Sequence, residues 1–182
     1  MFSTNYKQDS ERSYIDIGGY SPEFASSDDD IAWVELYDND HWNVPIHWIE
    51  YNGKDIGAHD ELEAAMIDTG TALVYLETEV MNAWFRALDQ THPGDCDQYF
   101  FDAYPACYCD SQDDFHPLTF KLGEYILEMQ PDEYVVETYD ENYDTVCYFL
   151  ISENVYGHGN KKVALLGDAF MRNYYIVHDM YN

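Results

Sequence analysis

A lone acidic residue between two apolar runs is the feature of this sequence best suited to chemistry. In the stretch AAMIDTGTALVYL, residues 64–76, apolar residues lead into Asp68, and Thr69, Gly70 and Thr71 follow before the apolar run resumes. The first run predicts a buried strand that ends at the carboxylate. Gly70 permits a sharp turn, and nearby hydroxyl and N–H donors orient a carboxylate. An Asx turn closing a strand is the simpler explanation of the triplet alone.

The elements that would position this loop are mostly short β-strands. Residues 42–48 alternate apolar with other side chains, and Pro45 within them predicts an edge position or a bulge. Similar patterns, separated by turn-rich segments, predict further strands in SYIDIGG (13–19), DIAWVELY (30–37), EAAMID (63–68), LTFKL (118–122), YILEM (125–129), TVCYFLI (145–151), KKVALLG (161–167) and YYIVHDM (174–180).

One segment has clear helical periodicity. In TEVMNAWFRAL, residues 78–88, the apolar residues Val80, Trp84 and Leu88 recur every four positions, and Thr78 is the expected N-cap. Its apolar stripe is expected in the core, and a shorter helix is expected at 168–173. The fold class predicted from these patterns is mainly β with one or two short helices.

The composition sets limits on size and partners. The chain has 182 residues, 46% of them hydrophobic, which is enough for one domain with a sizeable core. Its 36 acidic against 8 basic residues give a net charge of −28, which disfavours nucleic acid and anionic membranes as partners. The acidity fits a solvated surface, adaptation to high salt, or work in acid. No apolar run is long enough to cross a bilayer, and the start does not have the pattern of a signal peptide.

The cysteines and histidines are the remaining candidates for special chemistry. Cys96, Cys107, Cys109 and Cys147 are an even number, which predicts two disulfides in an oxidising compartment. A zinc site with His92 is the alternative, although a Cys-x-Cys pair lacks the usual ligand spacing. All seven histidines are expected to be structural or surface residues, so we expect no metal or other cofactor.

Two separated motifs together resemble pepsin-like aspartic proteases. Asp-Thr-Gly-Thr between apolar runs resembles the second active-site motif of that family. VALLGDAFMRNYYIVHD, residues 163–179, resembles a late segment in which Leu-Gly packs beneath the catalytic loop, a role that falls here to Leu166 and Gly167. The motifs lie about a hundred residues apart, as in the C-terminal lobe of the family. The resemblance extends over residues 2–182 and implies a pepsin-like lobe, the barrel-like half of a bilobal fold.

The resemblance also implies roles for the residues of the loop. Asp68 would be one of two catalytic aspartates that share a proton and activate a water for peptide hydrolysis at acid pH. Thr69 would link the two catalytic loops across the lobe boundary, and Thr71 would donate a hydrogen bond to Asp68. Gly70 would allow close approach of a peptide substrate. No cofactor is implied. Among the cysteines the resemblance implies a Cys109–Cys147 disulfide, and it leaves Cys96 and Cys107 as a second pair.

The sequence departs from the family pattern in three ways. Ala72 stands where the family usually has serine, which affects expected substrate contacts more than chemistry. Asp-Thr-Gly occurs once, so the motif of a first lobe is not in these residues. The family normally continues past the VHDMYN of 177–182 into a final short strand. We therefore expect residues 1–182 to be a C-terminal lobe, with the N-lobe absent and the final strand trimmed.

The expected function is that of an aspartic endopeptidase that is inactive as an isolated lobe. It would need an N-lobe chain, or a second copy that places two Asp68 side chains at a twofold axis, together with a peptide or protein substrate. The alternative is a catalytically inactive pepsin-like module that binds a protein or has a structural role. Disulfides and acid chemistry favour secretion or a lysosomal or vacuolar location.

Overall fold

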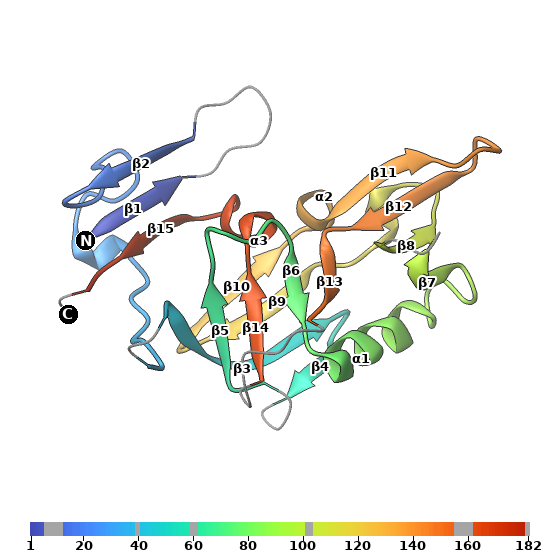
Figure 1. Ribbon diagram of the computed structural model, residues 1–182, viewed down its shortest axis with the longest axis horizontal. Coiled ribbons are helices and arrows are strands. Elements are labelled where there is room, and N and C mark those ends of the chain that lie inside the picture. The colour runs from blue at the N-terminus through green and yellow to red at the C-terminus, as the bar shows by residue number, and fades with distance from the viewer. Residues whose placement is uncertain (6–12, 39–40, 59–61, 101–103, 155–161, 181–182) are drawn as a thin grey trace.

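The structure, a computed structural model, consists mainly of β-strands arranged in three sheets (Figure 1). It describes residues 1–5, 13–38, 41–58, 62–100, 104–154 and 162–180. The prediction of a mainly β fold with short helices is confirmed. The sheets contain three, eight and four strands.

The eight-stranded sheet contains the strand that leads to Asp68. Its order is β10-β9-β3-β5-β14-β6-β13, and β4 pairs with β3 beside this path. Its strands are β3 (Asn43–Tyr51), β4 (Lys54–Ala58), β5 (Ala64–Ile67), β6 (Val74–Leu76), β9 (Leu118–Leu122), β10 (Tyr125–Met129), β13 (Ile151–Glu153) and β14 (Val163–Leu166). Strands β5 and β14 run parallel, with Ile67 opposite Leu166. The residues that follow the two strands therefore leave the sheet side by side, at the carboxyl ends of β5 and β14.

The three-stranded sheet joins the two ends of the described chain. Its order is β15 (Tyr175–His178), β1 (Phe2–Asn5), β2 (Tyr14–Ile17), with antiparallel pairing throughout. Figure 1 shows this sheet at one end of the molecule, with the two termini close together. The N-terminal residues are thus held by the last strand, because Phe2 pairs with His178.

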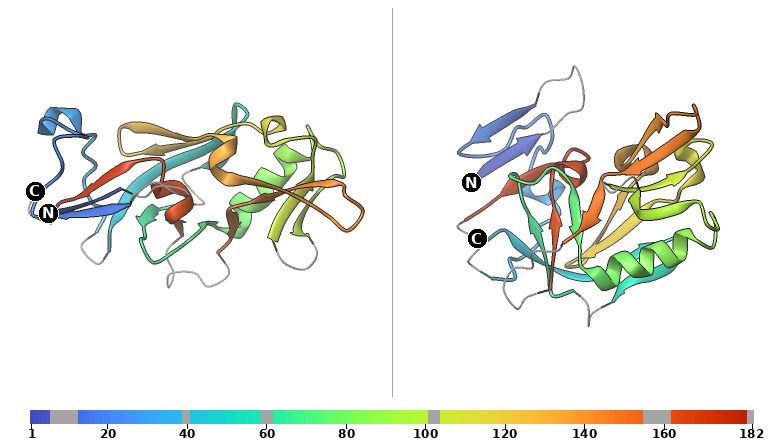
Figure 2. Two further views of the ribbon diagram at one scale, coloured as in Figure 1. Left: turned by 90° about the horizontal axis from the view of Figure 1, so that it is seen from above. Right: turned by 45° about the vertical axis from the view of Figure 1, so that its right-hand side comes forward.

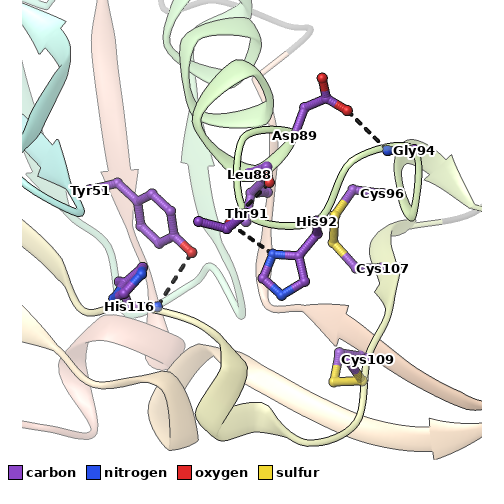
Figure 3. The surroundings of a disulfide bond; sticks show 11 residues. Tyr51, Leu88, Asp89, Thr91, His92, Gly94, Cys96, Cys107, Cys109 and His116 are labelled. Carbon is purple, nitrogen blue, oxygen red and sulfur yellow. Dashed lines mark hydrogen bonds between the residues drawn. A yellow bond between two sulfur atoms is a disulfide. The ribbon is translucent and has the colours of Figure 1, made fainter.

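The four-stranded sheet carries both disulfides. Its order is β11 (Val135–Tyr139), β12 (Thr145–Phe149), β8 (Tyr104–Tyr108), β7 (Cys96–Phe100). One disulfide joins Cys96 to Cys107 and the other joins Cys109 to Cys147 (Figure 3). The zinc alternative is wrong, because these two bonds use all four cysteines. His92 instead accepts or donates a hydrogen bond with the Thr91 hydroxyl at 2.8 Å.

Helix α1 (Thr78–Leu88) has the bounds that its periodicity predicts, and it packs its apolar stripe into the core. Trp84 is completely buried and contacts the rings of Tyr51 and Phe149. The predicted N-cap is wrong: Glu77 occupies that position, while the Thr78 hydroxyl donates to the Glu153 carboxylate. Figure 2 shows α1 running alongside β4. The other helices are α2 (Pro131–Tyr134), α3 (Asp168–Met171) and 3-10 turns at Asp28–Asp30 and Gln112–Asp114.

The alternation in β3 changes face at a bulge. Relative to β9 the register shifts between Ile46 and Trp48. One extra residue reverses which side chains face the core, so Val44 and Ile46 are buried before the bulge, and Ile49 is buried after it. Of the two explanations offered for Pro45, the bulge applies and the edge does not, since β3 lies between β5 and β9.

The predicted strand at 30–37 is wrong. Asp30 is the last residue of the 3-10 turn at Asp28–Asp30, and residues 31–37 have no regular secondary structure. Their apolar and aromatic composition favours a strand, but a strand also needs a partner with which to share backbone hydrogen bonds. No strand among the described residues pairs with them. Tertiary context therefore overrides the local preference.

Candidate active site

The carboxylate of Asp68 stands at the end of β5, beside the end of β14. The backbone N–H of Asp68 donates to the carbonyl oxygen of Leu166 at 3.2 Å, and this hydrogen bond extends the parallel pairing of β5 with β14 by one residue. The buried residues Ala64, Ala65 and Met66 anchor β5 in the sheet. Asp68 itself is half-buried. An apolar strand thus delivers an acid to the surface at a defined position.

Both oxygens of this carboxylate accept hydrogen bonds from its own loop. The N–H of Gly70 donates to Oδ1 of Asp68 at 2.9 Å, and the Thr71 hydroxyl donates to Oδ2. The N–H of Thr71 also donates to the Asp68 carbonyl oxygen at 3.2 Å, which closes the turn. These donors fix the orientation of the carboxylate plane. Thr69 and Gly70 are exposed beside it, as is the side chain of Ala72.

The segment after β14 lies directly against the loop. Gly167 donates its N–H to the carbonyl of Leu73 at 3.2 Å, and Asp168 donates its N–H to the carbonyl of Thr71 at 2.8 Å. A Cβ at position 167 would lie 2.5 Å from the Leu73 carbonyl oxygen, and closer still to that of Thr71. Only glycine fits there, and Leu166 before it is completely buried. The 166–168 segment therefore supports the backbone of the Asp68 loop.

Asp168 is a site residue that the sequence reasoning missed. It begins α3 and is half-buried, and its Oδ1 atom has no hydrogen-bond partner among the described residues. Burial raises the pKa of Asp168, the negative charge of Asp68 raises it further, and Arg172 acts in the opposite direction. The signal for it was the parallel pairing of β5 with β14, which places both acids just beyond paired strand ends.

The arrangement suits acid–base chemistry at an accessible carboxylate. A half-buried carboxylate with both oxygens held in place can accept a proton from a water, but the water must be polarised from a second side to become a strong nucleophile. Among the described residues no cluster of three or more His, Cys, Asp or Glu side chains is arranged to bind a metal ion. Within the same ranges no helix is long and apolar enough to span a membrane.

Comparison with known proteins gives a consistent result. The family model for eukaryotic aspartyl protease matches residues 1–182. Gastricsin from Cavia porcellus is 26% identical over 176 residues, which cover 97% of this chain and 41% of gastricsin. Rhizopuspepsin-2 from Rhizopus niveus is 28% identical over 164 residues, 88% of this chain and 36% of that protein. Vacuolar protease A from Neurospora crassa is 28% identical over 153 residues, 82% of this chain and 34% of that protein.

This chain spans less than half the length of each of these relatives. The family match nevertheless extends over its whole length, including the Asp68 loop and the segment beneath it. The chain belongs to the eukaryotic aspartyl protease family.

Proposed function

We propose that this chain supplies one of the two catalytic carboxylates of an aspartic endopeptidase. The observation that supports the proposal is the Asp68 loop, in which Gly70 and Thr71 each hold one oxygen of an accessible carboxylate. The match to the eukaryotic aspartyl protease family supports peptide hydrolysis as the proposed reaction. Asp68 is the proposed catalytic residue, and Leu166 and Gly167 are proposed to support its loop.

The second carboxylate would come from an N-lobe. A single carboxylate has no partner with which to share a proton, so it cannot hold a water between two acids. Residues 1–182 are proposed to belong to the C-terminal lobe of a bilobal enzyme. Thr69 is exposed next to Asp68, where it is proposed to hydrogen-bond to the matching loop of the other lobe.

In the assembled site, the two acids would share one proton and bind one water. The ionised carboxylate accepts a proton from that water while the water oxygen attacks the scissile carbonyl carbon. The protonated acid donates a hydrogen bond to the developing oxyanion. Because the two groups interact strongly, they titrate as a pair. The expected substrates are unfolded or extended peptides, cleaved between bulky apolar residues in acid.

The test combines residues 1–182 with an N-lobe from a pepsin-like relative and measures cleavage of a denatured protein near pH 4. We expect cleavage that a statine-type transition-state mimic blocks and that Asp68→Asn abolishes. Asp113→Asn is the matched control, because it makes the same charge change at an exposed acid outside the site. Cleavage that persists in Asp68→Asn, or no cleavage across an acidic pH series, would contradict the proposal.

A twofold dimer is the other way to bring two acids together. Two copies would have to place their Asp68 loops at the symmetry axis, with the same surface on both sides. Sedimentation across a concentration series distinguishes this assembly from one with an N-lobe. A monomer at all concentrations excludes the dimer and leaves the N-lobe arrangement.

Ala72 favours a second candidate function, an inactive pepsin-like binding module. Its exposed methyl group stands where the family usually offers a serine hydroxyl to substrate. Such a module would keep a stable protein partner after Asp68→Asn, whereas an enzyme would lose turnover. For either function, the two disulfides favour an oxidising compartment, so we propose secretion or a lysosomal or vacuolar location.

A further inference from the structure

Three of the four cysteines lie in one row across the four-stranded sheet. Cys96 on β7 is directly opposite Cys107 on β8, and Cys107 is directly opposite Cys147 on β12. Directly opposite side chains of antiparallel strands project from the same face of the sheet. Cys107 therefore has a cysteine on either side of it: its disulfide partner Cys96, and Cys147, which belongs to the other disulfide.

The spacing of this row allows Cys107 to bond to either neighbour. Opposite Cα atoms in antiparallel strands are about 4.5–5.5 Å apart, and a disulfide spans about 4.4–6.8 Å between Cα atoms. The Cβ atoms of Cys107 and Cys147 would have to approach each other by about 1 Å to reach the separation found in disulfides. Cys96 and Cys147 lie two strands apart, which is about 10 Å, so these two cysteines cannot bond.

The two disulfides differ in which sulfur a dissolved molecule can reach. Cys107 and Cys147 are completely buried, whereas Cys96 and Cys109 are half-buried against the core. Figure 3 shows the Cys96–Cys107 bond, with Cys109 further along the chain after β8. The rate of thiol–disulfide exchange depends on access to the sulfur that is attacked. A dissolved thiol should therefore attack Cys96 and not Cys107.

Carboxylates flank both of the accessible cysteines. Asp95 and Asp97 stand on either side of Cys96, and Asp110 follows Cys109; all three acids are exposed. The chain as a whole has a net charge of −28. Such a surface repels an anionic thiol, whereas it attracts the ammonium group of an aminothiol. The charge therefore favours a small cationic thiol as the reactant.

From this arrangement we propose that Cys96 is a site of modification by a small cationic thiol, and that Cys107 relays the exchange to the second disulfide. In the first step the thiolate of the aminothiol attacks Sγ of Cys96. A new S–S bond forms there, and the Cys96–Cys107 bond breaks with its electron pair leaving on Cys107. In the second step the Cys107 thiolate attacks Sγ of Cys147. The Cys109–Cys147 bond then breaks with its electron pair leaving on Cys109.

The two steps balance without an oxidant or a reductant. One thiol is consumed and one is released, because Cys109 takes up the proton that the aminothiol lost. A charged thiolate is costly at the buried Cys107, so the second step moves the charge toward water. The products are a mixed disulfide at Cys96, a Cys107–Cys147 bond and a thiol at Cys109. This inference goes beyond the proposed catalytic function and does not depend on Asp68.

Two serine variants test the relay without any added thiol. Cys96→Ser and Cys107→Ser remove the same disulfide, but the first leaves Cys107 beside Cys147, and the second leaves Cys96 two strands away from it. Each full-length chain is labelled with N-ethylmaleimide at neutral pH, and the labelled cysteine is identified by peptide mapping in acid. We expect the label at Cys109 in Cys96→Ser and at Cys96 alone in Cys107→Ser. Label at Cys107 or no label in Cys96→Ser, or label at Cys109 in Cys107→Ser, would overturn the relay.

The native chain supplies a second test, which does not depend on how well the variants fold. It is treated with cysteamine, sampled at early times, quenched in acid and mapped without reduction. We expect cysteamine on Cys96, a Cys107–Cys147 bond and a free thiol at Cys109. The proposal fails if cysteamine first appears on another cysteine or does not react. It also fails if the Cys109–Cys147 bond stays intact in chains that carry cysteamine on Cys96.

The preference for a cationic thiol has its own measurement. Rates with cysteamine and with mercaptoacetate are each divided by the rate of the same thiol with an uncharged model disulfide. We expect cysteamine to have an advantage of about tenfold at low salt, which disappears as added salt screens the charges. Asp95→Asn combined with Asp97→Asn should reduce this advantage, whereas Asp29→Asn, the same change in the 3-10 turn at Asp28–Asp30, should not. Equal or faster reaction with mercaptoacetate would refute the choice of a cationic thiol.

Discussion

Gly167 and Thr71 are packed so closely that the site loop and the segment after β14 form one structural unit. The Asp168 N–H donates to the Thr71 carbonyl at 2.8 Å, and no side chain fits at position 167. Thr71 in turn donates its hydroxyl to Asp68. Residues almost a hundred positions further along the chain therefore support the loop whose own donors orient the candidate catalytic carboxylate.

Gly167→Ala should destabilise the protein strongly. The new Cβ overlaps the backbone of Thr71 and Leu73, so the loop must move, at a cost of about 3 kcal/mol. The control is Gly19→Ala, because a Cβ there meets nothing within 4 Å. Denaturant unfolding measures both changes. Similar stability losses in the two variants would show that the packing at Gly167 is unimportant.

Thr71→Val should weaken the loop that holds Asp68. The substitution keeps the branched shape but removes the hydroxyl donor to the carboxylate, which we expect to cost about 1–2 kcal/mol at pH 7. Thr71→Ser keeps the hydroxyl and should cost less. The free energy of unfolding checks the order of the three proteins. If valine matched threonine, the hydroxyl would have no role in holding the carboxylate.

His178 should make stability fall in acid. Burial lowers the pKa of His178 to about 4, whereas an unfolded histidine titrates near pH 6.5. The unfolded chain therefore binds the proton more tightly. The contribution of His178 to the free energy of unfolding is fully present above about pH 6.5. It is lost as pH falls to about 4, which lowers the free energy of unfolding by about 3 kcal/mol.

The comparison with His178→Phe isolates this effect. Repulsion among the many carboxylates also changes with pH, but it changes equally in both proteins. We expect the free energy of unfolding of His178→Phe, relative to that of the native protein, to rise as pH falls from 7 to 4, because only the native protein loses stability through His178. A difference that stays constant across this range would mean that His178 does not titrate with a lowered pKa.

Asp168→Asn should stabilise the protein at neutral pH. Burial, with a further contribution from Asp68, raises the pKa of Asp168 above its usual value near 3.8. Because the folded protein binds this proton more tightly than the unfolded chain does, Asp168 lowers the free energy of unfolding as pH rises from about 3.8 through the folded pKa. The melting temperature of the variant should therefore exceed that of the native protein at pH 7, and the gain should shrink toward pH 3.

Asp30→Asn gives a control of opposite sign. The Ser26 hydroxyl and two backbone N–H groups lower the pKa of Asp30, so its charged form stabilises the fold. This variant should melt lower than the native protein at pH 7. If Asp168→Asn lowered the melting temperature at pH 7 as Asp30→Asn is expected to do, the assignment for Asp168 would be wrong.

The two disulfides should differ in their contribution to stability. Cys109–Cys147 joins residues 38 positions apart, and Cys96–Cys107 joins residues 11 apart. The chain-entropy model gives a loss of about 4 kcal/mol for removing the first and about 3 kcal/mol for the second. Serine pairs at each position, compared by denaturant unfolding, check the order. A larger loss of stability on removing Cys96–Cys107 would show that loop length does not decide how much each disulfide contributes.

Local patterns predicted many of the elements and the hydrogen-bond donors of the Asp68 loop. Period-two runs predicted β5, β9, β10 and β14, and the four-residue spacing of apolar positions predicted α1 with its observed bounds. The hydrogen bonds from Gly70 and Thr71 to Asp68 span two and three residues, so their donors are visible in the sequence. Short-range structure of this kind depends on neighbouring residues and can be predicted from them.

Long-range pairing decided the rest. The bulge in β3 depends on its register with β9, and the irregular path of 31–37 depends on the absence of a partner strand from the described residues. Asp168 interacts with Asp68 because β5 and β14 pair in parallel. The sequence alone determined that an acid would be held by its own loop at a strand end. Only the tertiary structure decided what lies beneath and beside it, because packing joins residues that no local pattern connects.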